Sequence, residues 1–492
     1  MLIYVLFGVL IFSGFAALIP NIKNNTLHRI GLSTAVTATV LTLWISGPVL
    51  LGTQESWQTF FWEVSRFGSL VACLIVFVYL GAMLVSQKYL TVEEKKGILS
   101  TNHVRLYMVC VPLFVLSMLV SIFANNAGII WVALEATTLS TTLLVSFYRK
   151  KSSMEAAWKY IVLCSTGIAL GLFGILMLGY AGSLAGLSEG EVFNMHLLRS
   201  AGSSLNQDIV KWAFVFLFVG FGTKVGFVPL HTWLPDAHSK TPAPVSAMLS
   251  GVLLNVAFFT LLRFKVITDT VLASSQWTNY FFLIFGTLSV ILPAIILISQ
   301  RNYKRMLAYS SVEHMGLLAF FVSLGPVGIV PFSIHMIGHT LAKSALFYGA
   351  GEFLQRFEST KFALVHATMA RAPRTSTLFL LALLLLIAVP PSGLFLSEFM
   401  LVGLGFSQNP WLTAIVVLGL SLAGVGMIRS VLSLLFGEIT PNEKQEIAQE
   451  HWNTTHTIMA IHIILGIAFG FWCLTGNGLL FLTQVSGSFF TL

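Results

Sequence analysis

Ionisable side chains lie inside segments of the chain that are apolar and long enough to cross a membrane. These side chains are Glu135, Lys159, Lys224, Glu313, Lys343 and Glu398. A charge near the centre of a bilayer costs about 2.5–3.5 kcal/mol on insertion scales, so such residues are kept where they pair with one another or where ions pass. The positions therefore predict translocation of protons or other ions.

The composition indicates a membrane protein. Hydrophobic residues make up 56% of the 492 residues and charged residues only 9%, whereas charged residues are about 25% of an ordinary globular domain. About fourteen apolar stretches approach the ~20 residues of a membrane-spanning helix. We expect them at 2–19, 27–51, 67–88, 105–122, 127–148, 157–180, 210–230, 244–264, 279–299, 306–324, 328–351, 375–403, 410–436 and 456–482. The predicted fold class is an all-α polytopic membrane protein. The first stretch lacks a basic leader and a small-residue cleavage site, so we expect it to be retained.

Proline interrupts the seventh and the twelfth stretch, at Pro229 and at Pro390. A proline removes a backbone donor and clashes with the preceding turn, so each helix must open there. Freed backbone groups within a membrane are tolerated where they are buried or line a wet cavity. Counting from the fourth and from the ninth stretch, each break lies in the fourth helix of a five-helix unit, which indicates inverted repeats around a transport path.

The predicted organisation has four parts. We expect three helices in residues 1–104, a first five-helix repeat in 105–266, a second in 279–436 and a last helix in 456–492. Corresponding helices of the two repeats carry the charges in pairs: Glu135 with Glu313, Lys159 with Lys343, and Lys224 with Glu398.

Three basic residues of the eleventh stretch, His335, His339 and Lys343, follow one another at intervals of four. At about 100° per residue they fall within about 80° of one helix face, an arrangement suited to passing a proton along a line. Structural roles are alternatives elsewhere. A buried pair of Glu135 and Lys224 could hold two helices together, the neighbouring His314 could satisfy Glu313, and His231 could cap a helix beside the first break as readily as pass protons.

The sequence predicts no redox centre, metal or nucleotide cofactor in the chain. Its cysteines, Cys73, Cys110, Cys164 and Cys473, are each alone in an apolar stretch and lack the spacing of iron–sulfur or zinc ligands. No glycine-rich phosphate loop follows a strand. We therefore expect no catalytic centre in this chain and an energy source outside it.

Basic residues give the orientation. Most Lys and Arg residues lie nearest the odd-numbered connections between the stretches, which places these connections in the cytoplasm and both termini on the outer side. The net charge of +8 reflects this bias and gives no reason to expect nucleic-acid binding. We expect a multi-pass protein of a bacterial or archaeal plasma membrane.

The run GFGTKVGFVPLHTWLPDAHSKTPAPVSAMLSGVLLNVAFFTLLRF resembles the signature of the antiporter-like proton-channel subunits of respiratory complex I, Mrp antiporters and related assemblies. WVALEATTLSTTLL, AAWKYIVL, YSSVEHMG, HTLAKSALF and GLFLSEFM are similar to further blocks of that family, and the resemblance covers about residues 105 to 435. Within the family, WVALEATTLSTTLL and YSSVEHMG most resemble the F subunit of hydrogenase-4 and its kin in group 4 membrane-bound hydrogenases.

The resemblance implies a proton path through the family's acidic and basic positions, which match Glu135, Lys224, His335, His339, Lys343 and Glu398. This sequence departs from the family pattern at Asn255, where many complex I members carry lysine or histidine. Asn cannot hold a proton charge, so the centre of the path would rest on water and on the neighbouring basic residues.

Two functions follow from the resemblance. The first is a proton-translocating subunit, with Na⁺ as a possible coupling ion, of a redox-driven complex. Its partners would be homologous membrane subunits and a peripheral arm, either an iron–sulfur/nickel–iron hydrogenase or an NADH dehydrogenase-like one. The alternative is a subunit of a multi-subunit cation/proton antiporter driven by ion gradients alone.

Overall fold

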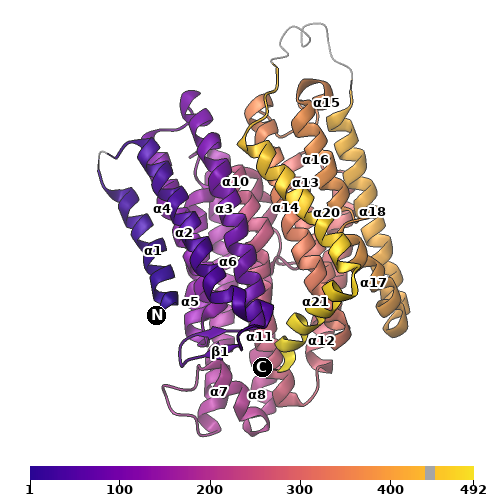
Figure 1. The fold of residues 1–492 in the computed structure, drawn as a ribbon. Helices are drawn as coiled ribbons and strands as arrows, with labels where there is room; N and C mark the ends of the chain where they lie inside the picture. The colour runs from indigo at the N-terminus through magenta and orange to yellow at the C-terminus, as the bar shows by residue number, and fades with distance from the viewer. Residues whose placement is uncertain (21, 438–448, 492) are drawn as a thin grey trace.

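Apolar helices make up most of the chain and run side by side (Figure 1). The computed structural model describes residues 1–20, 22–437 and 449–491 and is 82% helical. Among these residues, ten helices are long and apolar enough to cross a membrane, and three further apolar helices are 10–17 residues long. The predicted all-α polytopic fold is therefore confirmed, while the count of fourteen spans stays a prediction.

The elements follow the expected order. The N-terminal part contains α1 (Leu2–Leu18), α2 (Asn24–Leu51), the two-stranded hairpin β1 (Trp57–Gln58) and β2 (Glu63–Val64), and α3 (Arg66–Lys95). The next part contains α4 (Thr101–Phe123), α5 (Ala127–Val145), α6 (Lys151–Leu184), α7 (Met195–Ala201), the 3₁₀ turn η1 (Gly202–Ser204), α8 (Gln207–Val225), α9 (Trp233–Lys240), α10 (Ala243–Met248), the π turn η2 (Leu249–Leu253) and α11 (Leu254–Leu272). The rest contains α12 (Gln276–Ile298), α13 (Tyr303–Ser323), the 3₁₀ turn η3 (Gly325–Gly328), α14 (Ile329–Phe357), α15 (Thr368–Arg371), α16 (Pro373–Leu386), α17 (Gly393–Gln408), α18 (Pro410–Leu435), α20 (Thr454–Cys473) and α21 (Gly476–Thr491).

Polar side chains fix where several of these helices begin. The side chains of Asn126, Asn206 and Asn302 accept hydrogen bonds from the first-turn amides of α5, α8 and α13, and Ser392 does the same for α17. Such caps satisfy amides that have no partner within the helix. They set the helix register and so decide which side chains face the interior.

The two predicted breaks are present. The helix α8 ends at Val225, and Gly226 follows with a φ of 88°, a conformation that glycine adopts without strain. Pro229 lies in the turn before α9. In the twelfth stretch α16 ends at Leu386 and α17 begins at Gly393, with Pro390 between them. The proposed inverted symmetry of the two repeats stays a prediction.

Two features were not predicted. The eighth stretch is a longer helix, 243–272, with the π turn η2 inside it, and its most apolar window is wholly buried. A Cβ on Gly251 of this turn would lie 2.7 Å from the Ser344 hydroxyl, so glycine allows η2 to approach α14 closely. The expectation of one continuous helix at 456–482 is wrong. The chain turns between Cys473 and Gly476, and a Cβ on Gly478 would lie 2.1 Å from the Trp472 carbonyl oxygen.

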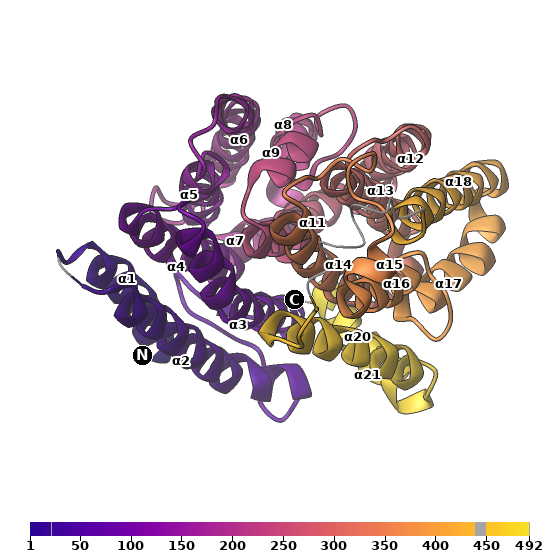
Figure 2. The same cartoon turned by 90° about the horizontal axis from the view of Figure 1, so that it is seen from above.

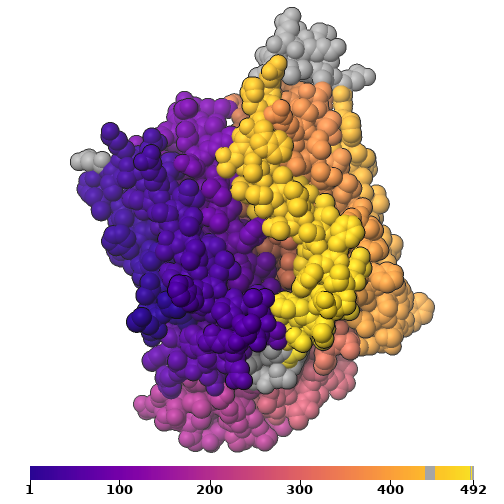
Figure 3. All heavy atoms as spheres, viewed as in Figure 1, coloured from indigo at the N-terminus to yellow at the C-terminus, as the bar shows by residue number. Residues whose placement is uncertain are grey.

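Viewed from above, α3, α11 and α14 lie in the interior (Figure 2). The helices α6, α8, α12 and α18 form one edge, and α1, α2, α20 and α21 form the opposite one. The space-filling view shows α20 and α21 (yellow) over the junction between the N-terminal helices and the C-terminal half (Figure 3). We refer below to the upper end of Figure 1 as the α15 end and to the lower end as the α7 end.

Candidate functional site

Lys224 is fully buried near the end of α8, just before the first break. Its Nζ donates to the Thr138 hydroxyl at 2.8 Å and to the Tyr160 hydroxyl at 3.0 Å. The Thr138 hydroxyl in turn donates to Glu135 Oε2 at 3.3 Å, and Ser165 donates to Glu135 Oε1 at 2.6 Å. The predicted Glu135–Lys224 association is therefore indirect, through one hydroxyl. The last turn of a helix also favours a cation through the helix dipole.

Lys159 lies apart from this buried group. Its side chain is 47% exposed, and Nζ pairs with Glu155 at 2.7 Å and Asp236 at 3.5 Å. Asp236 also pairs with Arg305 at 2.7 Å. The placement of Lys159 inside a span stays a prediction, because the whole of α6 (Lys151–Leu184) is a candidate membrane span and Lys159 lies about two turns from its start.

The predicted line of basic residues on α14 is buried against α13. His335 Nε2 is hydrogen-bonded to His314 Nδ1 at 2.9 Å, and His335 Nδ1 to the Ser397 hydroxyl at 2.9 Å. The rings of His314 and His339 have centroids 5.2 Å apart. Lys343 Nζ donates to the Leu307 carbonyl at 2.7 Å and also to the Ser310 hydroxyl. His314 thus belongs to this line of basic residues, although the sequence indicated it only as a neighbour of Glu313.

Two carboxyl groups meet beside this line. Glu313 of α13 is buried, and its Oε2 has no hydrogen-bond partner among the described residues. Glu398 reaches the same place from α17. A cavity of about 20 Å³ is lined by Glu313, His314, Leu386, Ile387, Glu398, Leu420, Gly424 and Met427. The alternative in which His314 satisfies Glu313 has no support in the described hydrogen bonds, since His314 bonds to His335 instead.

Asn255 connects the π turn to α14. Its Nδ2 donates to the Gly251 carbonyl and to the Thr340 hydroxyl, both at 2.9 Å, and Thr340 donates to the same carbonyl at 2.8 Å. The Asn255 Oδ1 is buried without a partner among the described residues. His231 lies buried in the turn between α8 and α9, with its ring 6.2 Å from that of Tyr309. Asn255 of α11 thus contacts α14, and the ring of His231 lies near α13.

A second buried polar group lies toward the α15 end. Glu93 is buried near the end of α3, and the Tyr148 hydroxyl lies 2.9 Å from both of its carboxylate oxygens. The Tyr89 hydroxyl lies 2.9 Å from that of Tyr148. Glu93 was not among the predicted site residues, because the predicted span ends at residue 88 whereas α3 continues to Lys95. The available signal was the run YLTVEEK at 89–95, whose residues are compatible with about two further helical turns.

Lys304 and His238 lie between this group and the α14 line. Lys304 is buried in the first turn of α13, and its Nζ donates to the Thr241 carbonyl just after α9 at 2.7 Å. His238 of α9 is fully buried, and neither ring nitrogen has a partner among the described residues. Its ring stacks on Phe347 of α14 at 5.4 Å. Lys304 was missed as a path residue because the sequence placed it in a connection. His238 flanks the first break, where it could cap the helix as readily as pass protons.

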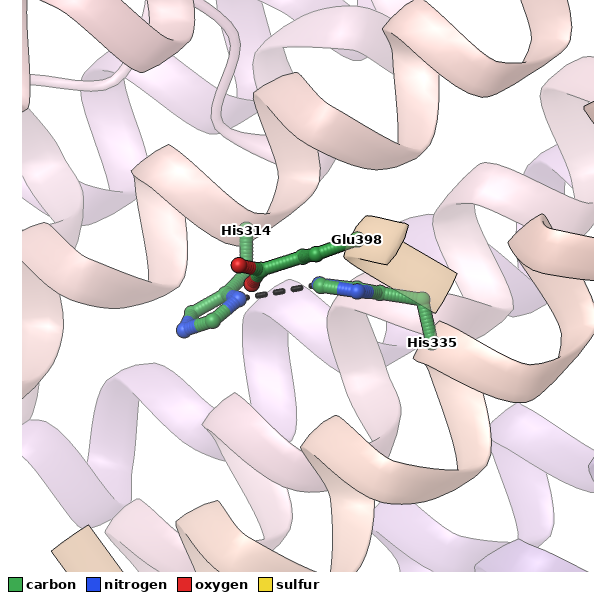
Figure 4. A group of neighbouring side chains, drawn as sticks. All are labelled: His314, His335 and Glu398. Atoms are coloured by element: carbon green, nitrogen blue, oxygen red, sulfur yellow. Dashed lines mark hydrogen bonds between the residues drawn. The ribbon is translucent and has the colours of Figure 1, made fainter. Parts of the chain in front are cut away.

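The side chains of His314, His335 and Glu398 come from three helices and point toward one another (Figure 4). One ligand atom from each lies within 4.8 Å of the other two. Among the described residues this is the group that could hold a metal ion. The cysteines are free and lie on four different helices.

Residues 124–424 match the sequence pattern of a family described as NADH:quinone oxidoreductase/Mrp antiporter, transmembrane. The chain is 35% identical over 381 residues to a hydrogenase-4 component F homolog of Methylacidiphilum infernorum, covering 77% of this chain and 79% of that protein. It is 28% identical to hydrogenase-4 component B of Escherichia coli over 348 residues, which span 68% of this chain and 49% of the relative.

Solved structures share the fold. A chain of the membrane-bound sulfane sulfur reductase, an archaeal respiratory membrane complex, superposes with a TM-score of 0.88 at 20% identity, covering 99% of this chain and 97% of the other. A chain of the Mrp complex from Dietzia sp. superposes with a TM-score of 0.81 at 15% identity, covering 98% and 95%. At these identities the likeness concerns the fold alone.

Proposed function

We propose that this chain, which belongs to the NADH:quinone oxidoreductase/Mrp antiporter transmembrane family and is an antiporter-like membrane subunit, moves protons across the membrane. It does so within a redox-driven complex of the hydrogenase-4 type. The observation that carries the proposal is the row of buried ionisable residues that begins at Glu93 near the α15 end and leads to the partly buried Glu398 beside the second break. Burial of so many such groups in a membrane is costly, and such residues are kept where they pair with one another or where ions pass.

The first half of the path centres on Lys224. A carboxylate close to a lysine favours the charged form of the lysine, and removal of the carboxylate favours release of the proton. The Thr138 hydroxyl transmits this influence, because it bonds to both Lys224 and Glu135. A movement of Glu135 toward or away from Thr138 therefore makes Lys224 take up and release a proton.

The second half uses the histidines. A neutral imidazole accepts a proton on one ring nitrogen and gives one up from the other. His314 and His335 are hydrogen-bonded to each other, and a carboxylate oxygen of Glu398 lies within 4.8 Å of a ring nitrogen of each, so a proton can pass between the histidines and on to Glu398. Glu313 and Glu398 line one small cavity, so two carboxyl groups are at hand there to take up and release a proton.

The orientation gives the path a direction. We place the α15 end in the cytoplasm and both termini on the outer side of a bacterial or archaeal plasma membrane, on the basic bias of the odd connections. Glu93, Lys304 and His238 then form the uptake side. Lys343 and the histidines lead from there toward Glu398.

The energy source lies in partner chains on this proposal. We expect no redox cofactor in this chain, because its cysteines lack the close sequence spacing of iron–sulfur ligands. The relative named hydrogenase-4 component F homolog supports a nickel–iron and iron–sulfur arm with homologous membrane subunits beside this one. The matching family also takes in Mrp antiporters, which favours a second candidate, a cation/proton antiporter subunit driven by gradients, with Na⁺ as the counter-ion.

Purification in mild detergent separates these candidates. The first predicts co-purification of a redox arm and acidification or alkalinisation of vesicles only when its electron donor is supplied. The second predicts co-purification of other antiporter subunits and Na⁺-dependent proton movement under an imposed gradient. A lone chain that moves ions by itself would contradict both.

A further inference from the structure

We propose that His314, His335 and Glu398 bind one divalent transition-metal ion, Zn²⁺ in particular, and that the bound ion blocks proton movement. The binding site rests on geometry alone. The block rests in addition on the proposed function. The ion is an inhibitor that the protein acquires from solution, in contrast to a resident cofactor.

The distances suit a single ion. Zn²⁺ bonds to histidine nitrogen and carboxylate oxygen at about 2.0–2.2 Å, so two ligand atoms of a tetrahedral ion lie roughly 3.3–3.6 Å apart. His314 Nδ1 and His335 Nε2 are 2.9 Å apart, and all three ligand atoms lie within 4.8 Å of one another. Figure 4 shows the Glu398 carboxylate beside the His314 ring, opposite His335. Side-chain movements of about an ångström bring the three onto one ion.

The surroundings of the three side chains suit a metal-binding site. A metal-bound histidine usually donates its other ring N–H to an oxygen, which fixes the ring orientation. His335 uses Nε2 toward His314, and its Nδ1 lies 2.9 Å from the Ser397 hydroxyl, as this arrangement requires. The adjoining cavity of about 20 Å³ has room for one water as a fourth ligand.

A second acidic group strengthens the site. Glu313 is buried, lines the same cavity, and has an unpartnered Oε2 among the described residues. Its negative charge offsets that of a divalent ion, directly or through the water. Ile387 in the wall of the cavity begins the non-helical segment between α16 and α17, so the site adjoins the second break.

The donor set selects the class of ion. Two imidazoles and a carboxylate favour Zn²⁺, Co²⁺, Ni²⁺ or Cu²⁺, whereas Na⁺, Mg²⁺ and Ca²⁺ prefer all-oxygen sites. Binding needs the lone pairs of both imidazoles, so it replaces the His314–His335 hydrogen bond. It also ties α17 to α13 and α14. Both effects remove a step of the proposed proton relay.

The test uses the complex purified in detergent and stripped of loosely bound metal with a chelator. Co²⁺ is added, and visible absorption of a tetrahedral Co²⁺ site is recorded, followed by displacement with Zn²⁺ and counting of bound Zn²⁺. We expect wild type to bind one Zn²⁺ more than His314→Ala or Glu398→Gln. Ser397→Ala, which keeps all three ligands, should weaken affinity about tenfold. His462→Ala removes a buried histidine of α20 outside the cluster and should bind as wild type does.

Equal Zn²⁺ binding by wild type, His314→Ala and Glu398→Gln would overturn the site, whatever the vesicle assays show. In vesicles, micromolar Zn²⁺ should stop proton movement by wild type and by His462→Ala, and a chelator should restore it. Full pumping with Zn²⁺ bound would contradict the proposed inhibition, while the proposed binding site would stand. Absence of pumping in metal-free wild type would instead count against the proposed function.

Discussion

The Lys224 ammonium and the Glu135 carboxylate are joined through a single hydroxyl. Thr138 accepts a hydrogen bond from Lys224 at 2.8 Å and donates one to Glu135 at 3.3 Å. The hydroxyl has one proton to donate and lone pairs to accept, so it can serve both groups at once. The electrostatic coupling of Glu135 to Lys224 therefore depends on a side chain that carries no charge.

Replacement of Thr138 by valine, which has the same shape, should lower proton pumping at least about tenfold, because a hydrogen bond to a charged group contributes about 1.5–3 kcal/mol. Thr138→Ser should keep most of the rate. Thr142→Val is the matched control, since the Thr142 hydroxyl bonds only to the Thr138 carbonyl among the described contacts. Pumping would be read from a pH-sensitive dye in vesicles, and an unimpaired Thr138→Val would contradict the coupling.

The buried carboxylate near the α15 end offers a test of proton uptake. Glu93→Gln keeps the size of the side chain and removes its negative charge beside Tyr148, so we expect slower pumping with an unchanged amount of assembled complex. Glu94→Gln is the control, because Glu94 bonds to Asn24 at the edge of the bundle. Equal pumping rates for the two variants would remove Glu93 from the path.

Glu450 gives a pH dependence of stability outside the membrane spans. Burial raises its pKa, but hydrogen bonds from His456, the Thr375 hydroxyl and the amides of Arg374 and Thr375 outweigh burial and bring the pKa to about 2 from an ordinary 4.5. A lowered folded-state pKa stabilises the protein above the ordinary value, and this is lost as pH falls from about 4.5 through about 2.

Glu450→Gln should therefore lower the melting temperature of the solubilised chain at pH 7, and the difference from wild type should shrink toward pH 3. Scanning fluorimetry at both pH values measures this. A difference that stayed constant over the range would show that the Glu450 charge does not stabilise the fold.

Much of the fold and part of the site follow from local rules. Proline and glycine at 226–229 and 390–393 had to interrupt their helices, whatever the tertiary structure. The i, i+4, i+8 spacing had to place His335, His339 and Lys343 on one face. Burial of Lys224 followed from its position deep in an apolar stretch.

Other features depend on neighbours that the sequence does not reveal. Lys159 lies about two turns into α6, where its half-exposed side chain pairs with Glu155 and Asp236 and does not join the buried group around Lys224. Glu93 is buried only because α3 extends beyond its apolar core and packs beside Tyr148. The His314–His335 bond joins two helices, and no local pattern specifies such a contact.

Lys224 tests the central claim most directly when it is compared with Lys159, because one lysine is fully buried and the other is 47% exposed. Lys224→Met and Lys159→Met would be reconstituted as whole complexes, and proton movement would be measured against electron-donor oxidation. A surface ion pair contributes about 0–1 kcal/mol, so Lys159→Met should keep nearly full pumping. We predict that Lys224→Met inserts and assembles yet builds no pH gradient. A wild-type gradient in the Lys224→Met vesicles would contradict the account.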